Sequence, residues 1–401
     1  MRGVKLLLAG QACGQVGDAV VSLVAAQMLL FANDQESMKS SLLSSIGFML
    51  PVMLLIGPVA GIIVDRYNRR HILVAGHCAR GALALLLMIC LSASHLELAL
   101  VCLAMMLGTT RVLYSARTAS VVHFVRKHEL PAIDSMSFIL GMASGLVGGG
   151  VAALLLDLNW YLALLVAALL QFFAGRLFTS IDIDQFAFHS VRTPRSFSGM
   201  REQLLASKIR FAIGSTASLR LLLGLTVASV ALHVGNRLSL EAVGFALLLA
   251  LISTGNFLGS LTAEWFVERF RRRSIAVLAS ASSAVSIMVG QVIGSPILQL
   301  ATVAFCAFAF QNLRICTDSS VQANTPDEVL GRVFATYDVI YNVAYAVGIV
   351  LGVGLSGVVP VGAVLAVICV SHVSLAALLV RGTETVSITA ATSPVQQPAV
   401  G

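Results

Sequence analysis

The sequence predicts an all-α membrane protein with twelve transmembrane helices arranged as two six-helix repeats. Hydrophobic residues make up 58% of the 401 residues and charged residues only 11%, whereas an ordinary globular chain has about 25% charged residues. The mean hydropathy is +0.91. Too few charged side chains are therefore present to cover the surface of a soluble enzyme, and the chain is too apolar to be disordered.

Twelve segments are apolar enough to cross a bilayer, for which a helix needs about 20 residues. A backbone in lipid must satisfy its own hydrogen bonds, so each segment is expected to be helical. The expected spans lie near residues 6–32, 41–64, 72–94, 97–119, 133–156, 159–180, 217–238, 240–263, 275–294, 297–317, 332–357 and 360–380. The seventh and eighth spans are the least clearly separated, because only Asn236 to Ser239 lies between them.

The distribution of Lys and Arg predicts the orientation of the helices. Nineteen of the 26 Lys and Arg residues lie on one side of the predicted bundle, with Arg220 counted among them, and two lie on the other side. Loops rich in Lys and Arg stay in the cytoplasm, so both termini are expected to be cytoplasmic, in the inner membrane of a bacterium. The net charge of +7 then reflects topology, and no nucleic-acid partner is expected.

The longest polar stretch divides the chain into two halves. We expect an N-terminal six-helix bundle at 1–181, a cytoplasmic linker at 182–216, a C-terminal six-helix bundle at 217–381 and a cytoplasmic tail at 382–401. The linker contains a basic amphipathic segment, Met200 to Arg210, which either lies along the anionic inner leaflet or is a solvated connection.

The two halves resemble each other at a spacing of about 200 residues, as expected for repeats related about the membrane normal, one of the architectures of secondary transporters. Two pairs of segments show the repeat: Asp65-Arg66 with Arg69-Arg70 against Glu268-Arg269 with Arg272-Arg273, and His128-Glu129-Leu130 against Asp327-Glu328-Val329.

The loop between the second and third spans carries a specific motif, Gly61-Ile62-Ile63-Val64-Asp65-Arg66-Tyr67-Asn68-Arg69-Arg70. It resembles the loop signature of the major facilitator superfamily, G-x-x-x-D-R-x-G-R-R/K, with Asn68 in place of the second glycine. Asn adopts a positive φ more readily than most residues, so the turn is expected to form. The resemblance covers Leu6 to Arg381 and implies the twelve-helix transporter fold of that superfamily.

The resemblance implies that this motif forms a cytoplasmic gate. Gly61 permits close helix approach, and Asp65 can face the positive N-terminal end of the eleventh span. The arginines of the motif either bind carboxylates and lipid headgroups or only follow the orientation rule. The expected gate residues, with Arg117 of the fourth span as a further partner of Asp65, are Gly61, Asp65, Arg66, Arg69, Arg70 and Arg117.

A second motif lies in the fifth span, where Gly141, Gly145, Gly149 and Gly150 are spaced as in the antiporter signature G-x-x-x-G-P-x-x-G-G, with Leu146 in place of the proline. The resemblance implies an exporter that exchanges substrate for protons. The alternative is a glycine-rich packing face without a role in direction, because small residues let helices approach closely.

Three further segments resemble the branch of the superfamily that contains macrolide efflux pumps and the enterobactin exporter. They are Gly17-Asp18-Ala19, Ala79-Arg80-Gly81 and Gln322 to Val333. These segments indicate a branch and not a substrate.

Ionisable side chains at membrane depth are functional candidates, because their insertion is costly. We expect Asp18, Arg80 and Asp338 to take part in proton coupling. Desolvation favours the protonated form of a carboxyl group and so lets it load and release protons. For Asp18 the alternative is an interhelical salt bridge, and Arg80 would hold either a carboxylate on an adjacent helix or an anionic substrate.

Polar and aromatic side chains that share a helix face are expected to line a substrate cavity. Tyrosines suit a large amphipathic substrate, since they stack and donate hydrogen bonds, although ordinary helix packing is the alternative. The expected cavity residues are Gln11, Gln15, Tyr337, Tyr341, Tyr345, Asn342 and Gln311.

No phosphate-binding loop, metal-ligand spacing or catalytic arrangement is visible in the sequence. We therefore expect no enzyme activity, no metal and no cofactor, with a proton gradient as the source of energy. The prediction is a monomeric transporter that exports an amphipathic small molecule, such as a drug or a siderophore, by alternating access across the lipid bilayer. An importer or a lipid translocator is the nearest alternative, and a non-transporting membrane scaffold is the most distant.

Overall fold

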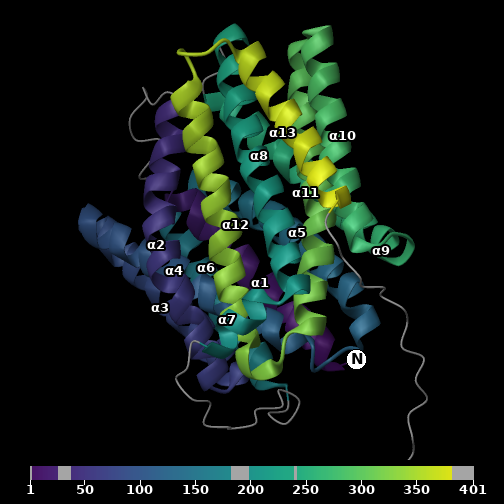
Figure 1. Cartoon of the computed structure of the whole chain (residues 1–401). Coiled ribbons are helices and arrows are strands. Elements are labelled where there is room, and N and C mark those ends of the chain that lie inside the picture. Colours follow the sequence, from purple (N-terminus) through teal and green to yellow (C-terminus); the bar gives the residue numbers. More distant parts are fainter. Residues whose placement is uncertain (1, 26–37, 182–197, 239–241, 382–401) are drawn as a thin grey trace, which may run out of the picture.

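The computed structural model of the chain describes residues 2–25, 38–181, 198–238 and 242–381, and every regular element in these ranges is a helix (Figure 1). The predicted tail 382–401, residues 182–197 of the predicted linker and residues 26–32 of the predicted first span lie outside the described residues.

Twelve long helices form two sets of six, as predicted. The first half consists of α1 (Arg2–Ala25), α2 (Met38–Arg66), α3 (Arg69–Ser92), α4 (Leu96–Val121), α5 (Leu130–Leu158) and α6 (Trp160–Thr179), with a 3₁₀ turn at Lys127–Glu129. The second half consists of α8 (Ser207–Leu238), α9 (Ala242–Arg269), α10 (Arg272–Ile293), α11 (Pro296–Asn324), α12 (Asp327–Leu355) and α13 (Val361–Arg381). Among the described residues, ten of these twelve helices are long and apolar enough to cross a membrane. The remaining two are α2 and α9.

The short helix α7 (Ser198–Leu205) and the first residues of α8 occupy part of the predicted linker. The linker prediction was therefore too long at its C-terminal side, because α8 begins at Ser207 and not near residue 217. The seventh and eighth spans correspond to α8 and α9, and residues 239–241 between them lie outside the described residues.

The ends of the helices that carry most of the arginines meet at one end of the bundle, here called the basic end. There the Arg70 side chain donates to the backbone oxygens of Phe178 and Thr179 at the end of α6, at 3.4 and 2.5 Å. In the second half Arg273 donates in the same way to the oxygen of Leu379 near the end of α13, at 2.5 Å. These side chains donate to carbonyl groups at helix ends, where the last four lack an intrahelical partner, and the two arginines bind corresponding helix ends of the two halves.

Glycines allow α8 and α12 to pack backbone against backbone. A Cβ atom added at Gly348 would collide with the backbone oxygen of Leu221 and lie 2.9 Å from the backbone nitrogen of Leu225. A Cβ at Gly224 would collide in the same way with the backbone oxygen of Tyr345. Close approach of this kind is how helices associate in a lipid environment, where hydrophobic burial alone gives little preference for one neighbour.

We predict that Gly348→Ala lowers the free energy of unfolding by about 1–3 kcal/mol, the usual cost of overpacking a close contact. Neither neighbour can move aside, because both are backbone atoms. The matched control is Gly354→Ala on the same helix, where an added Cβ meets nothing within 4 Å. Thermal unfolding of the purified chain in detergent measures both. Equal stability of the two variants would contradict the close packing.

Candidate functional site

The hydrogen bonds and ion pairs that join the two halves, within the described part of the chain, lie between the basic end and the middle of the bundle. The farthest of them involves Asp338, about 16 Å along α12, a helix about 43 Å long. The main contact at the basic end involves Asp65 at the end of α2. Its carboxylate accepts hydrogen bonds from the backbone N–H groups of Gly331 and Arg332, at 2.8 and 3.1 Å, and from Nε of Arg332 at 2.8 Å.

Asp65 therefore binds the second turn of α12, near the N-terminal end of the helix, as the resemblance implied. A carboxylate near this end is favoured by the helix dipole. Gly61 makes the contact possible, because a Cβ there would lie 2.6 Å from Cα of Arg332. The predicted partner Arg117 was wrong: its guanidinium lies 5.6 Å from the ring centroid of Tyr114, and the charged partner of Asp65 is Arg332.

Asn68 plays a different part from the one expected of it. Its φ is −59°, so the turn requires no positive φ, and its side chain accepts a hydrogen bond from the backbone N–H of Arg70 at 2.9 Å. Asn68 is thus the N-cap of α3, a position at which Asn is among the preferred residues.

Arg69 adds a second contact between the halves. Its guanidinium donates to the carboxylate of Asp327 at 2.7 Å and to the backbone oxygen of Ala119 at 3.0 Å. His123 lies 3.2 Å from the same carboxylate and 2.7 Å from Arg69. Arg66, by contrast, is exposed and lies over the ring of Tyr67.

The glycines of the antiporter-like motif divide into two groups. A Cβ at Gly141 would lie 3.0 Å from the side chain of Gln15 on α1. The motif residues Gly145, Gly149 and Gly150 would meet nothing within 4 Å. Of the motif glycines named from the sequence, only the first therefore packs against another helix in this structure.

A polar and aromatic cluster, here called the interface cluster, lies between the halves above the gate. Its members are Arg111, Tyr114 and Arg117 of α4, Asp134 and Phe138 of α5, Arg220 of α8, Arg314 and Asp318 of α11, and Asp338, Tyr341 and Tyr345 of α12. The group combines four arginines with three aspartates.

Asp338 joins the halves within this cluster. One carboxylate oxygen lies 3.2 Å from the guanidinium of Arg111. Asn342 donates to the other carboxylate oxygen at 3.2 Å and to the backbone oxygen of Asp338 at 2.7 Å. Only 5% of the Asp338 side chain is exposed. Protonation would remove the charge that holds Arg111 and so would weaken a contact between the halves.

Arg314 forms a second junction. It donates to the hydroxyl of Tyr341 at 2.7 Å and to that of Tyr114, in the other half, at 3.4 Å. Its guanidinium also lies 4.5 Å from the ring centroid of Phe138 and 3.8 Å from Asp318. The pairing with Asp318 has the i, i+4 spacing typical of neighbours on one helix face, whereas the partners across the interface cannot be inferred from spacing.

Asp134 is a buried carboxylate that the sequence analysis did not single out. It accepts hydrogen bonds from the hydroxyl of Ser319 at 2.9 Å and from the amide of Gln322 at 3.2 Å, both on α11. Its position only one turn into α5 made it resemble a residue of the loop. The signal that could have identified it is that Ser319 and Gln322 are polar at the helical spacing i, i+3.

Arg220 was assigned to the cytoplasmic side by the sequence analysis, and this assignment was wrong. Because α8 begins at Ser207, Arg220 lies about 20 Å along the helix. Its guanidinium is 4.1 Å from the ring centroid of Tyr345, 4.7 Å from that of Phe310 and 5.8 Å from that of Tyr341.

Asp18 and Arg80 form an ion pair inside the first half, between α1 and α3. Gln171 of α6 donates to Asp18 at 2.5 Å and to the backbone oxygen of Gly14 at 2.9 Å, and its own carbonyl oxygen lies 2.8 Å from Nδ1 of His77. Arg80 is 6% exposed at its side chain and Asp18 24%. All these partners belong to one half, which favours the salt-bridge alternative for Asp18.

Several of the predicted cavity residues hold helices together. Gln11 donates to the backbone oxygen of Ser137 at 2.8 Å and to Gln15 at 3.1 Å. Gln311 donates to the hydroxyl of Ser260 on α9 at 3.0 Å. Tyr337 is completely buried. Tyr341, Tyr345 and Asn342 belong to or border the interface cluster.

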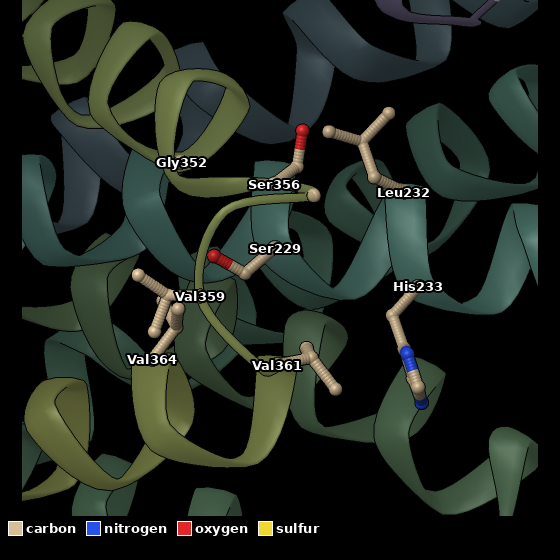
Figure 2. A pocket seen from close by; sticks show the side chains of 9 residues that line it. Ser229, Leu232, His233, Gly352, Ser356, Val359, Val361 and Val364 are labelled. Atoms are coloured by element: carbon tan, nitrogen blue, oxygen red, sulfur yellow. The ribbon is translucent and has the colours of Figure 1, made fainter.

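A separate pocket lies where α8, α12 and α13 meet (Figure 2). It includes Gly352 near the end of α12, whereas Asp65 contacts the beginning of that helix. Its volume is about 310 Å³, and its lining is mostly apolar, with Ser229, Ser356 and His233 among valines and a leucine. None of the residues predicted from the sequence lines it.

Comparison with known proteins places these features in a family. The transmembrane secretion effector family of the major facilitator superfamily matches residues 5–397. An MFS-type transporter of Mycobacterium bovis is 25% identical over 378 residues, which cover 87% of this chain and 84% of that relative, and the same values hold for one of Mycobacterium tuberculosis.

Solved structures of transporters have the same fold. A bacterial homologue of the iron transporter ferroportin, in an outward-facing state, superposes with a TM-score of 0.72 at 14% identity and covers 95% of this chain and 99% of that one. The fucose:proton symporter of Escherichia coli gives 0.70 at 14% identity, with 95% and 98% covered. With its twelve-helix fold and the contact of Asp65 with α12, the chain belongs to the transmembrane secretion effector family of major facilitator superfamily transporters.

Proposed function

We propose that this secondary transporter exports an amphipathic small molecule, such as a drug or a siderophore, in exchange for protons. Its basic end would face the cytoplasm, with both termini inside a bacterial inner membrane. The two halves would rock about the interface cluster to give alternating access, with protonation of a carboxylate shifting the balance between the two states.

The observation that carries this proposal is the ion pair between Arg111 and Asp338. It joins α4 of one half to α12 of the other at 3.2 Å. Among the carboxylates expected to couple protons, Asp338 is the one whose charge holds the halves together. Proton binding to Asp338 would therefore favour opening at the basic end, since it weakens a contact that joins the two halves in this structure.

The conformation supports the same cycle. Contacts between the halves are concentrated at the basic end, and one of the matching structures is in an outward-facing state. With the basic end cytoplasmic, the structure corresponds to the state that releases an exported substrate. The example substrates, a drug or a siderophore, are taken from the resemblance to the macrolide-efflux and enterobactin-exporter branch.

The transport test uses purified protein in proteoliposomes that contain a pH-sensitive dye, with a panel of macrolides and siderophores. In vesicles that expose the basic end to the outside, a proton-driven exporter should accumulate a compound only when the lumen is acidified. Accumulation with the gradient reversed would identify an importer. No proton movement with any compound of the panel would contradict proton-coupled export.

We predict that Asp338→Asn abolishes proton movement coupled to a transported compound and leaves downhill flux of the compound in place. The amide keeps the size of the side chain but has no proton to bind or release. Asp18→Asn is the matched comparison, because it also removes one buried charge beside an arginine. It should retain coupling and should lower the free energy of unfolding by about 3 kcal/mol, since it leaves the guanidinium of Arg80 without a carboxylate.

Dye fluorescence gives the coupling and thermal unfolding gives the stability. Loss of coupling in Asp18→Asn with coupling retained in Asp338→Asn would reverse the assignment and identify Asp18 as the proton-carrying residue.

We predict that Asp65→Asn shifts the protein towards a conformation open at the basic end by at least about tenfold, because it removes charge-assisted hydrogen bonds, each worth about 1.5–3 kcal/mol. Spin labels at the exposed positions Tyr67 and Asn324, on opposite halves of the basic end, measure the distance distribution. A longer distance should become prominent in the variant.

The control for this experiment is Glu268→Gln, the corresponding position of the second half. Glu268 is exposed, so its replacement should leave the distribution unchanged. A wild-type distribution in Asp65→Asn would show that Asp65 does not hold the gate.

A further inference from the structure

Arg220 is a cation inside the bundle that lacks a carboxylate partner. Among the described residues, no Asp or Glu forms an ion pair with it. Its Nε is buried and makes no hydrogen bond. A buried guanidinium is costly unless it is paired, so its presence here calls for a partner that the chain itself does not supply.

Aromatic rings surround this cation without neutralising it. The guanidinium lies 4.1 Å from the ring centroid of Tyr345, with Phe310 and Tyr341 as further neighbours. Cation–π contacts compensate for only part of the hydration that a guanidinium loses on burial.

The nearby carboxylates are already engaged. Asp338 pairs with Arg111, and Asp318 lies beside Arg314. Asp134 accepts hydrogen bonds from two polar side chains of α11. Because the interface cluster has one arginine more than it has aspartates, its surplus charge is positive.

Arg314 lies close to Arg220. The two guanidinium groups contact the same ring, that of Tyr341, at 4.8 and 5.8 Å from its centroid. Both groups are cations, so they repel each other across this ring. Arg220 is partly exposed, as is 14% of the Arg314 side chain, so neither side chain is fully closed to a ligand.

We propose that Arg220 and Arg314 bind the acidic group of the substrate, and that the substrate is an amphipathic organic anion with an aromatic ring beside a carboxylate or a similar acid. A guanidinium can hold a carboxylate through two parallel hydrogen bonds, and the partly exposed ring of Tyr345 can contact the aromatic part of the ligand. This inference rests on the proposed transport function and specifies the class of its substrate.

The test measures binding without any gradient, on the purified full chain in detergent. The probes are benzoate and its neutral analogue benzamide at about 50 mM and equal ionic strength, because a ligand that binds only the folded state raises the Tm. Benzoate should raise the Tm of the wild type by at least about 2 °C more than benzamide does. Arg220→Gln and Arg220→Met should abolish this difference. The methionine variant fills the space without adding an unsatisfied polar group, so it guards against a failure of the glutamine variant to fold.

The matched control is Arg269→Gln, which removes an arginine stacked on Trp265 at 5.2 Å outside the cluster. It should keep the full difference between benzoate and benzamide. Equal effects of the two probes on the wild type, or a full difference in the folded Arg220 variants, would overturn the proposal. Anion-selective binding without proton-driven flux would instead contradict only the proposed exchange of substrate for protons.

Discussion

The cost of holding a charge away from water governs this structure. A charged side chain inside the bundle is stable only with a partner, and Asp65, Asp338 and Asp18 each have an arginine. Two of these three pairs join the halves, and the third lies within one half. The ion pairs that lower the cost of these buried charges therefore have a second effect. Two of them hold the halves together near the basic end.

The contacts within a half and between halves differ in kind. Within the second half, Gly348 and Gly224 bring backbones into direct contact, an arrangement that permits little sliding. Between the halves, ion pairs and hydrogen bonds such as Arg111–Asp338 lie beside close packing of α2 on α12 at Gly57 and Gly61, and the strength of the polar contacts depends on protonation and on water. Rigid packing inside each half combined with reversible polar contacts between them is what rigid-body rocking requires.

Hydropathy alone predicted the helices, because lipid forces each backbone to satisfy its own hydrogen bonds. The role of Asp65 could also be predicted, since its motif combines a glycine for close approach with a carboxylate for a helix N-terminus. Arg220 was misplaced because an arginine near a span boundary looks like a loop residue until the true start of α8 is known. The partners of Arg111 and Arg314 depend on how two halves dock, which no local pattern in the sequence encodes.

The two halves share the arginine contacts at their helix ends, but they differ at the position of Asp65. Arg70 and Arg273 make equivalent contacts with the ends of α6 and α13. The counterpart of Asp65 is Glu268, which is exposed. Aligning His128-Glu129-Leu130 with Asp327-Glu328-Val329 places Ile133 where Arg332 stands, so the equivalent contact has no arginine. Each of these arginine contacts lies within one half, so its presence in both halves does not affect how the halves move relative to each other. A gate that must open is easier to regulate with one strong contact than with two, because each independent contact multiplies the equilibrium constant that opposes opening.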